Sequence, residues 1–301
     1  MRILLTGASG LLGSALTPLL TGAGRQVVPL ERRGGAPGPG EAVWEPGAGT
    51  IDLGQAGPLD AVVHLAGETI GQRWSAAAKR RMRESRCLGT RTLSVALAGL
   101  AQPPRAFVCA SATGYYGDRG EDWLEETSPP GRGFLAELTR DWEAAAAPAA
   151  ERGIRVVQLR FGIVLSRRGG GLAKMLPAFR HGLGGRLGDG HQYWSWLTIG
   201  DAVRCVAHAL ECDALRGPVN AVSPHPVTNR EFTSALGRVL GRPTFLAVPR
   251  FVLELMFGEM AREALLSSFR VRPARLLATG FAFAQPEVKE ALREVLGRAG
   301  G

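Results

Sequence analysis

The chain opens with Met1-Arg-Ile-Leu-Leu-Thr-Gly-Ala-Ser-Gly-Leu-Leu-Gly-Ser14, and this stretch decides the fold. A short apolar run is followed by glycines at positions 7, 10 and 13. A strand that turns through glycines into a helix leaves backbone N–H groups free at the helix N-terminus, where they can bind a pyrophosphate. The alternative is a glycine-rich turn without a ligand. We expect a pyrophosphate-binding loop formed by Gly7, Ser9, Gly10, Leu11, Leu12 and Gly13.

The composition is typical of a globular protein with one large or two modest domains. Of the 301 residues, 45% are hydrophobic and 21% are charged. No apolar run is long enough to span a bilayer, and Met1 leads directly into a strand instead of a signal peptide. We therefore expect a cytoplasmic protein without a membrane partner. The four cysteines lack C-x-x-C spacing and a clustered histidine, so we expect no metal site.

The net charge of +9 is the unusual number in the composition. Basic residues gather between Lys79 and Arg86, within a helix predicted over residues 76–98 that has few aromatic side chains. A face that binds nucleic acid ideally combines both kinds of residue. We interpret the basic segment as a solvated or anion-facing helix and expect no nucleic-acid partner. The positive charge suits an anionic cofactor and substrate.

Apolar runs alternate with helical patterns through the first half of the chain. Strands are predicted at residues 2–5, 26–30, 42–45, 60–67, 106–110 and 155–165, with helices at 11–21, 76–98 and 133–152 among them. Pro18 is expected to kink or shorten the first helix. The alternation predicts an α/β fold, a Rossmann doubly wound parallel sheet with its ligand outside the carboxyl ends of the strands.

The character of the sequence changes after residue 165, where glycine-rich segments and helical patterns replace the alternation. We expect residues 1–165 to form the nucleotide-binding domain, with a strand at 219–222 that returns to its sheet. Residues 166–301 are expected to form a small, mostly helical C-terminal domain that binds the substrate.

The end of the second predicted strand determines the choice of cofactor. An acidic side chain there binds the ribose 2′-hydroxyl of NAD, whereas an arginine accommodates the 2′-phosphate of NADP. The chain has Glu31 followed by Arg32 and Arg33. The two arginines favour NADP, with Arg32 on the phosphate and Glu31 turned aside or bonded to ribose; NAD is the alternative. Small residues that allow close approach end the fourth strand, so further expected contacts are Leu65, Ala66 and Gly67.

A hydroxyl-rich stretch, Ser111-Ala-Thr-Gly-Tyr-Tyr-Gly117, follows the fifth predicted strand. Loops at strand ends often contain catalytic residues, although a plain tyrosine-containing turn is the alternative. Farther along, glycine-rich segments lie beside the aromatic stretch 193–196 and predict a lid over a pocket for a small-molecule substrate. The alternative is an Ω-loop held by its tryptophans. The expected substrate contacts are Lys174, Tyr193 and Trp196.

Together these motifs resemble the atypical extended short-chain dehydrogenase/reductases, an NAD(P)-dependent epimerase-like family. The resemblance covers nearly the whole chain and implies a Rossmann domain that binds NADP(H), with Arg86 and Val164 facing the cofactor. Relatives often pair through their two long helices, so it is also compatible with a homodimer. The family's Trp-Ile-His is Trp196-Leu-Thr198 here, so no role carries over to position 198. The motifs are Thr6-Gly-Ala-Ser-Gly-Leu-Leu-Gly13, His64-Leu-Ala-Gly-Glu68, Ser111 to Gly117, Arg160-Phe-Gly-Ile-Val-Leu165, Lys174-Met-Leu-Pro177, residues 182–190 with Trp196, and Asn220-Ala-Val-Ser-Pro224.

The usual catalytic pair of this superfamily is missing. Its chemistry uses Tyr-x-x-x-Lys, in which a lysine one helical turn away lowers the pKa of the tyrosine. None of the tyrosines, at 115, 116 and 193, has a lysine four residues later. On the helix expected to carry the pair, counting back from Glu143 reaches Thr139.

Two hypotheses follow from the missing pair. The first is an NADP(H)-dependent oxidoreductase or epimerase-like enzyme acting on a carbonyl or sugar-type small molecule. Ser111 would hydrogen-bond the substrate carbonyl, Tyr115 or Tyr116 would act as the acid, and Arg119, Lys174 or a water would give electrostatic help. The second is a nucleotide-binding sensor or interaction protein without turnover, linked to cell division by the labels of some relatives.

Overall fold

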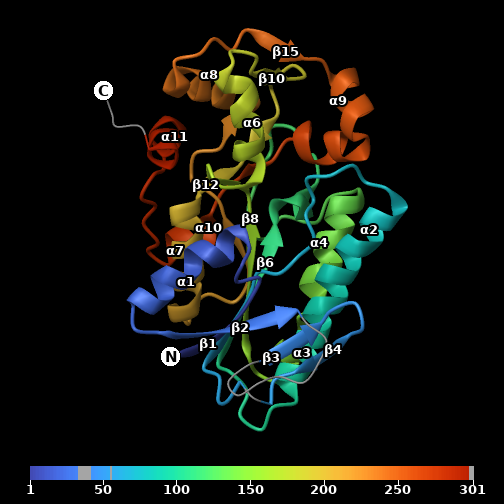
Figure 1. Cartoon of the computed structure of the whole chain (residues 1–301), viewed down its shortest axis with the longest axis vertical. Helices are drawn as coiled ribbons and strands as arrows, with labels where there is room; N and C mark the ends of the chain where they lie inside the picture. The colour runs from blue at the N-terminus through green and yellow to red at the C-terminus, as the bar shows by residue number, and fades with distance from the viewer. Residues whose placement is uncertain (33–41, 55, 298–301) are drawn as a thin grey trace.

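The fold is built on one large sheet. The computed structural model describes residues 1–32, 42–54 and 56–297, with the side chain of Arg32 excepted. Within them, an eight-stranded sheet has the order β13-β8-β6-β5-β1-β2-β3-β4, parallel except for the β3–β4 pair. The predicted doubly wound Rossmann sheet is confirmed (Figure 1). Its strands are β1 (Arg2–Thr6), β2 (Gln26–Arg32), β3 (Ala42–Glu45), β4 (Thr50–Asp52), β5 (Ala61–His64), β6 (Ala106–Ala112), β8 (Arg155–Phe161) and β13 (Gly217–Ala221).

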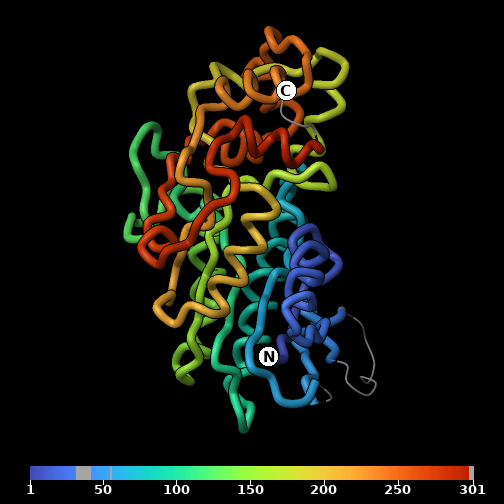
Figure 2. The backbone as a smooth tube through the Cα atoms, turned by 90° about the vertical axis from the view of Figure 1, so that its left-hand side faces the viewer, coloured from blue at the N-terminus to red at the C-terminus, as the bar shows by residue number. Residues whose placement is uncertain are grey.

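Helices cover both faces of this sheet: α1 and α7 lie on one side of the strands in Figure 1 and α2, α3 and α4 on the other, and Figure 2 turns the α1 side toward the viewer. Side chains alternate between the faces, so Ile3 and Leu5 of β1 pack with α1 and α7, while Leu4 packs with α3 and α5. Burial of each such side chain contributes about 2 kcal/mol. The helices are α1 (Leu11–Gly22), α2 (Ala76–Arg83), α3 (Gly89–Ala98), α4 (Phe134–Ala144), α5 (Ala147–Glu151) and α7 (Ile199–Glu211), with a π-helical turn at Glu84–Leu88 between α2 and α3.

The C-terminal part lies above the carboxyl ends of the strands in Figure 1. Its own core holds Phe179, Trp194, Trp196, Phe232 and Leu236. Its helices are α6 (Gly170–Arg180), α8 (Asn229–Leu240), α9 (Arg250–Phe257), α10 (Ala274–Ala278) and α11 (Val288–Leu296), with a π-helical turn at Ala261–Leu265. The short strands pair as β10 (Gly185–Leu187) with β15 (Leu246–Val248), β11 (Tyr193–Trp194) with β14 (Val227–Thr228), β12 (Trp196–Thr198) with β9 (Ile163–Leu165), and β16 (Arg270–Val271) with β7 (Trp123–Leu124).

Several elements differ from the sequence predictions for identifiable reasons. Helix α1 continues through Pro18 to Gly22, so the proline does not shorten it. The helix predicted over residues 133–152 is two helices, because Pro148 lacks an N–H and fits the first turn of a new helix. The strand predicted at 155–165 breaks at Gly162, where a Cβ atom would lie 2.3 Å from the carbonyl oxygen of Ser195. The antiparallel edge strand β4 was not predicted.

Every helix among the described residues is too short or too polar to cross a bilayer.

Candidate functional site

Two turns meet at the carboxyl edge of the sheet. Thr6 of β1 lies beside His64 of β5, so the turns that follow these strands are neighbours. Gly7 has a φ of +70°, and a Cβ atom there would lie 2.9 Å from the backbone N of Ala66. At Gly13 a Cβ atom would lie 2.1 Å from the carbonyl oxygen of Gly7, so only glycine lets α1 pack this closely on the loop.

The N-terminus of α1 is open to a ligand. Its N-cap is Gly10, which has no side chain to accept the first N–H groups, and the first turn contains no acidic residue. Free N–H groups and the helix dipole together favour an anion at this position. The local geometry therefore matches the phosphate-binding loop that the glycine spacing predicts.

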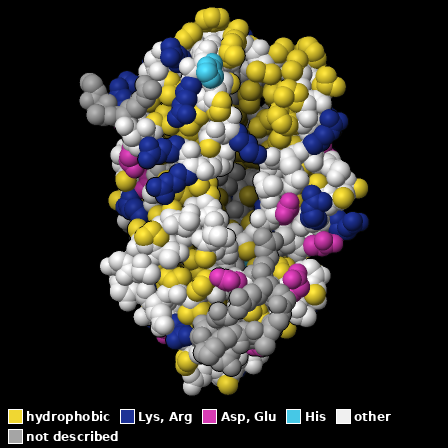
Figure 3. All heavy atoms as spheres, in the orientation of Figure 1, with side chains coloured by type: hydrophobic (Ala, Val, Ile, Leu, Met, Phe, Trp, Pro, Cys, Tyr) yellow, Lys and Arg dark blue, Asp and Glu magenta, His cyan; other side chains and the backbone are white. Residues whose placement is uncertain are grey.

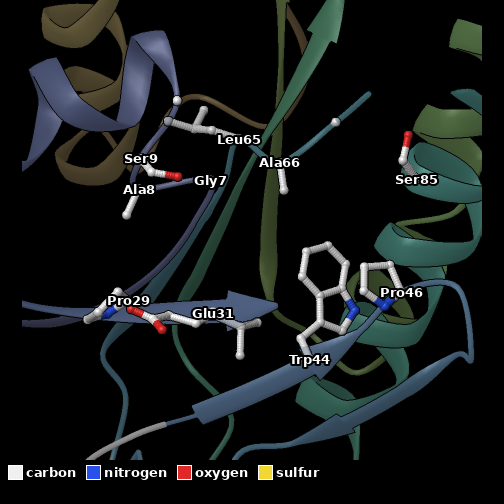
Figure 4. A pocket seen from close by; sticks show the side chains of 13 residues that line it. Gly7, Ala8, Ser9, Pro29, Glu31, Trp44, Pro46, Leu65, Ala66 and Ser85 are labelled. Carbon is white, nitrogen blue, oxygen red and sulfur yellow. The ribbon is translucent and has the colours of Figure 1, made fainter. Parts of the chain in front are cut away.

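A cavity of about 560 Å³ lies in front of the two turns. Figure 4 shows Ala8 and Ser9 on one side, Ser85 on the other, and Glu31 and Trp44 along the lower edge. Of the predicted cofactor contacts, Leu11, Leu12 and Gly13 lie in the first turn of α1, outside the lining. The lining residues are Gly7, Ala8, Ser9, Gly10, Pro29, Leu30, Glu31, Trp44, Pro46, Leu65, Ala66, Gly67 and Ser85.

A buried histidine network fixes the second turn. The hydroxyl of Thr6 lies 2.6 Å from Nδ1 of His64 and accepts the N–H groups of Leu65 and Ala66. On the other side of the ring, Nε2 of His64 lies 2.9 Å from the hydroxyl of Thr90. Burial, with a smaller contribution from the charge of Arg86, lowers the pKa of His64 to about 4. His64 is therefore neutral at pH 7 and holds the backbone of the turn in place.

Arg86 is a buried cation that forms no ion pair among the described residues, although the charge of Glu68 acts on it. It is 8% exposed, and its Nε and Nη1 atoms have no hydrogen-bond partner in the part of the chain that the structure describes. Its guanidinium carbon lies 5.0 Å from the Trp142 ring centroid and 3.2 Å from the position of a Cβ atom on Gly67. Burial lowers the pKa of Arg86 to about 10, so the group stays charged at pH 7. An unpaired buried charge is costly, so this arginine fits an anion bound beside Gly67.

The residues that choose the cofactor are only partly described. Glu31, the penultimate residue of β2, has an exposed side chain and lines the cavity. The side chain of Arg32 and the whole of Arg33 lie outside the described residues. The predicted contact between Arg32 and a 2′-phosphate therefore stays a prediction.

Ser111 belongs to a second, fully paired network at the ends of β6 and β8. Its hydroxyl donates to Oε1 of Glu143 on α4, at 2.6 Å. Arg160 on β8 binds both oxygens of the same carboxylate, from Nε and Nη2, at 2.7 Å each. Although burial acts to lower it, the hydrogen bonds and charge of Glu143 raise the pKa of Arg160 above its usual value. Thr139, one turn before Glu143, donates its hydroxyl to the carbonyl of Leu135.

The two tyrosines after Ser111 pack against Arg160. Tyr116 is 0% exposed, donates its hydroxyl to Asn220 at 2.7 Å and accepts a hydrogen bond from Arg160 at 2.9 Å. Burial raises the pKa of Tyr116 to about 12. The ring of Tyr115 lies 3.5 Å from the guanidinium carbon of Arg160. This geometry weighs against Tyr116 as a proton donor to a substrate.

The predicted substrate contacts are spread over the C-terminal part. Lys174 on α6 donates to the carbonyl of Gly71 at 2.7 Å, and so links α6 to the loop after β5. The ring of Tyr193 stacks with Arg270, at 4.6 Å. Trp196 is 0% exposed and donates its indole N–H to the carbonyl of His225. The buried tryptophan matches the structural Ω-loop alternative better than a ring that stacks on substrate.

Val164, the remaining predicted cofactor contact, pairs with Leu197 between β9 and β12. Figure 3 shows the surface hollowed in the middle of one face, between the sheet and the C-terminal part, with hydrophobic side chains beside the hollow. Among the residues that the structure describes, no group of His, Cys, Asp or Glu side chains could hold a metal ion.

Sequence reasoning missed two features of the site. Trp44 and Pro46 line the cavity at and after the end of β3, and the rule that ligands bind beyond strand ends could have found them. The second feature that sequence reasoning missed is the ion pair between Glu143 and Arg160. An arginine inside the apolar strand 155–161 was the available signal, because a buried charge needs a partner.

Comparison with known proteins gives matches over almost the whole chain. A sequence model of the NAD dependent epimerase/dehydratase family matches residues 3–221, and a domain of unknown function (DUF1731) matches residues 248–295. The Epimerase family protein Mb2239 of Mycobacterium bovis is 44% identical over 302 residues, which cover 99% of this chain and 98% of that protein. The human Epimerase family protein SDR39U1 is 38% identical over 302 residues, with 98% and 100% covered.

Solved structures agree with these matches. The crystal structure of human SDR39U1 (isoform2) with NADPH has a TM-score of 0.90 and 37% identity, covering 99% of this chain and 100% of that chain. The UDP-glucose 4-epimerase of Thermus thermophilus, in complex with NAD, has a TM-score of 0.74 at 22% identity, covering 99% and 100%, and shows the fold alone. The resemblance predicted from the motifs is confirmed: this chain belongs to the NAD dependent epimerase/dehydratase family.

Proposed function

We propose that this chain is an NADP(H)-dependent oxidoreductase of the epimerase-like type, acting on a small molecule that bears a hydroxyl or carbonyl group. The observation that carries the proposal is Arg86, a buried cation that forms no ion pair with the described residues, beside a glycine loop with open N–H groups. The human relative whose structure contains NADPH supports the same choice of cofactor.

The residues at the cavity fit the parts of a dinucleotide. In the proposal, the N–H groups at Gly10 and the first turn of α1 hold the pyrophosphate. Arg86 supplies positive charge from beneath Gly67, and Glu31 and Arg32 bind the ribose and the 2′-phosphate of the adenosine half. When bound, the cofactor supplies hydride transfer, and the protein supplies orientation and electrostatics.

Nucleotide binding is the direct test of this half of the proposal. Purified protein is titrated with NADPH and with NADH, and binding is followed by the fluorescence of the reduced nicotinamide. We expect tighter binding of NADPH. The Gly10→Trp variant, which fills the phosphate site, should bind neither nucleotide, and wild-type protein that binds neither would overturn the proposal.

The substrate side is tested by turnover. Ser111 at the end of β6 is the residue that we place next to the reacting group of the substrate, in keeping with its position at the sheet edge. A panel of ketones, aldehydes, secondary alcohols and nucleotide sugars is assayed with NADPH or NADP⁺. Turnover of a panel member supports an oxidoreductase or epimerase, and its absence, with NADPH still bound, removes that part of the proposal.

A second candidate is a nucleotide-binding sensor or interaction protein without turnover. It is favoured by Thr139 and Glu143, which occupy the helical spacing of the missing tyrosine and lysine, and by the buried hydroxyl of Tyr116. A partner whose retention in pull-down experiments changes on addition of NADPH would support this candidate. Equal retention by the Gly10→Trp variant, with or without NADPH, would count against cofactor sensing.

A further inference from the structure

The hydroxyl of Ser111 can only accept a hydrogen bond from a ligand. A serine hydroxyl has one proton and two lone pairs. Ser111 donates that proton to Oε1 of Glu143, at 2.6 Å, and no group among the described residues donates to its Oγ. The residue is 3% exposed and stands one position before the end of β6, at the carboxyl edge of the sheet. A substrate carbonyl would need a hydrogen-bond donor from Ser111, whereas a substrate hydroxyl can itself donate to Oγ.

The carboxylate that takes the proton of Ser111 is rigidly held. Arg160 binds both of its oxygens, and Gln158 donates to the backbone carbonyl of Glu143 at 2.7 Å. Arg160 is itself held by the Tyr116 hydroxyl and by the ring of Tyr115. These contacts hold the Oε1 atom of Glu143 within hydrogen-bond distance of the Ser111 hydroxyl. The Glu143 side chain keeps 11% exposure, which leaves a route for protons to solvent.

We propose that Ser111 and Glu143 form a proton relay that removes the hydroxyl proton of an alcohol substrate. The inference rests on the proposed oxidoreductase function and names its substrate class, a primary or secondary alcohol that reacts with NADP⁺. Ser111 is the catalytic residue because it contacts the substrate. Glu143 and Arg160 act through it as positioning residues.

The step balances in protons and electrons. The substrate hydroxyl donates to Ser111 Oγ, and the carbinol carbon loses a hydride to the oxidised nicotinamide cofactor, which is the oxidant. As the carbon–oxygen double bond forms, the substrate O–H bond breaks and its proton bonds to Ser111 Oγ. The former proton of Ser111 bonds to Glu143 Oε1 and then leaves for solvent. The products are a carbonyl compound, reduced cofactor and one proton.

Two variants and one matched control test the relay. Glu143→Gln keeps the size of the side chain but cannot accept the proton, and Ser111→Ala removes the relay oxygen while it leaves the Glu143–Arg160 ion pair intact. Glu137→Gln removes the same charge from an exposed position of α4. Dissociation constants for NADP⁺ and NADPH, kcat and KM are measured for each protein with a panel of secondary alcohols.

Loss of the relay should lower kcat for alcohol oxidation by about 100-fold or more, the usual range for a lost acid–base group. KM and both nucleotide dissociation constants should change by less than about threefold, because the relay acts in the chemical step. Glu143→Asp should recover part of the lost kcat, and Glu137→Gln should match the wild type. A role of Glu143 in packing alone would lower stability without this split between kcat and KM.

Failure of the relay is distinguishable from failure of the proposed function. If the wild type turns over but Ser111→Ala or a folded Glu143→Gln keeps kcat within about threefold, the relay is overturned and the oxidoreductase proposal stands. If the wild type binds NADP⁺ but oxidises no alcohol and reduces no ketone, both proposals are overturned. Should Glu143→Gln unfold, Ser111→Ala decides the question on the same criteria.

Discussion

Two regions at the same edge of the sheet differ in whether their polar groups have hydrogen-bond partners. At the ends of β1 and β5, the first turn of α1 has no side-chain cap, and two buried nitrogen atoms of Arg86 have no hydrogen-bond partner among the described residues. At the ends of β6 and β8, Ser111, Glu143 and Arg160 satisfy one another. Unpaired donors cost stability, so the first region is shaped for an anion, whereas the second has its donors paired and offers a ligand only the free acceptor of Ser111.

The difference separates the glycine loop, which matches the pattern of the family, from the ends of β6 and β8, where the Tyr-x-x-x-Lys pair is missing. The nucleotide edge keeps glycines at the positions where a Cβ atom would collide with backbone, as at Gly7 and Gly13. At the β6–β8 edge, Thr139 and Glu143 of α4 stand four residues apart, which is the spacing of the missing Tyr-x-x-x-Lys pair, and Arg160 neutralises the acid. The two edges therefore differ in whether their charged groups are paired.

The largest expected effect comes from breaking the paired region. Arg160→Met leaves Glu143 without its cation, and loss of one partner of a buried ion pair costs about 3–5 kcal/mol. We expect a fall of this size in the free energy of unfolding, measured by urea denaturation at pH 7. The double variant Arg160→Met/Glu143→Gln should recover a large part of it, because no lone charge remains. A single variant as stable as the wild type would show that the ion pair does not stabilise this region.

A smaller effect concerns pH and the turn after β5. The pKa of His64 falls from 6.5 to about 4 on folding. Between these two pH values the His64 imidazole is protonated in the unfolded chain and neutral in the folded chain. Stability is therefore full above pH 6.5 and falls by about 3 kcal/mol as pH drops to 4, with about 2 kcal/mol of the loss reached at pH 5.

Urea denaturation at pH 7 and at pH 5 measures this loss. The variant His64→Asn keeps a polar side chain in the turn but has no group that titrates, so its loss over the same interval should be about 2 kcal/mol smaller. Equal losses in the two proteins would show that His64 does not limit stability in acid.

Sequence patterns predicted one region far better than the other. Glycine spacing and apolar runs are local signals. They predicted the two turns that meet at Gly7 and Ala66, and most of the residues that line the cavity. The Glu143–Arg160 pair joins residues on separate elements, which only the sheet order β6-β8 and the packing of α4 bring together. Residue types in isolation could not show whether Tyr116 faces a substrate or the core, because tertiary packing decides this.

The open region is tested by removing its unpaired charge. Arg86→Met keeps a long side chain without the cation, so the unfolding free energy of the nucleotide-free protein should rise by about 1–3 kcal/mol. Affinity for NADPH and NADH should fall together by about 10- to 100-fold, the value of a charge-assisted hydrogen bond. Arg83→Met is the matched control, since Arg83 is already paired with Asp141 and should show neither change. A variant with lower stability and unchanged affinity would mean that Arg86 serves packing alone.

The smallest expected effect concerns Glu263, which supports the helix of the paired region. Glu263 of the C-terminal part accepts the N–H groups of Phe134 and Leu135 at 3.0 and 2.8 Å, and so caps the helix that carries Glu143. Glu263→Ala should cost about 1 kcal/mol of stability, the usual value of a helix cap, in urea denaturation. Glu137→Ala, exposed on the same helix, should cost less. If nucleotide affinity is unchanged in Glu263→Ala while kcat falls, the C-terminal part positions α4 for chemistry and leaves the nucleotide edge untouched. Equal losses at both edges would instead mean that the two regions share one support.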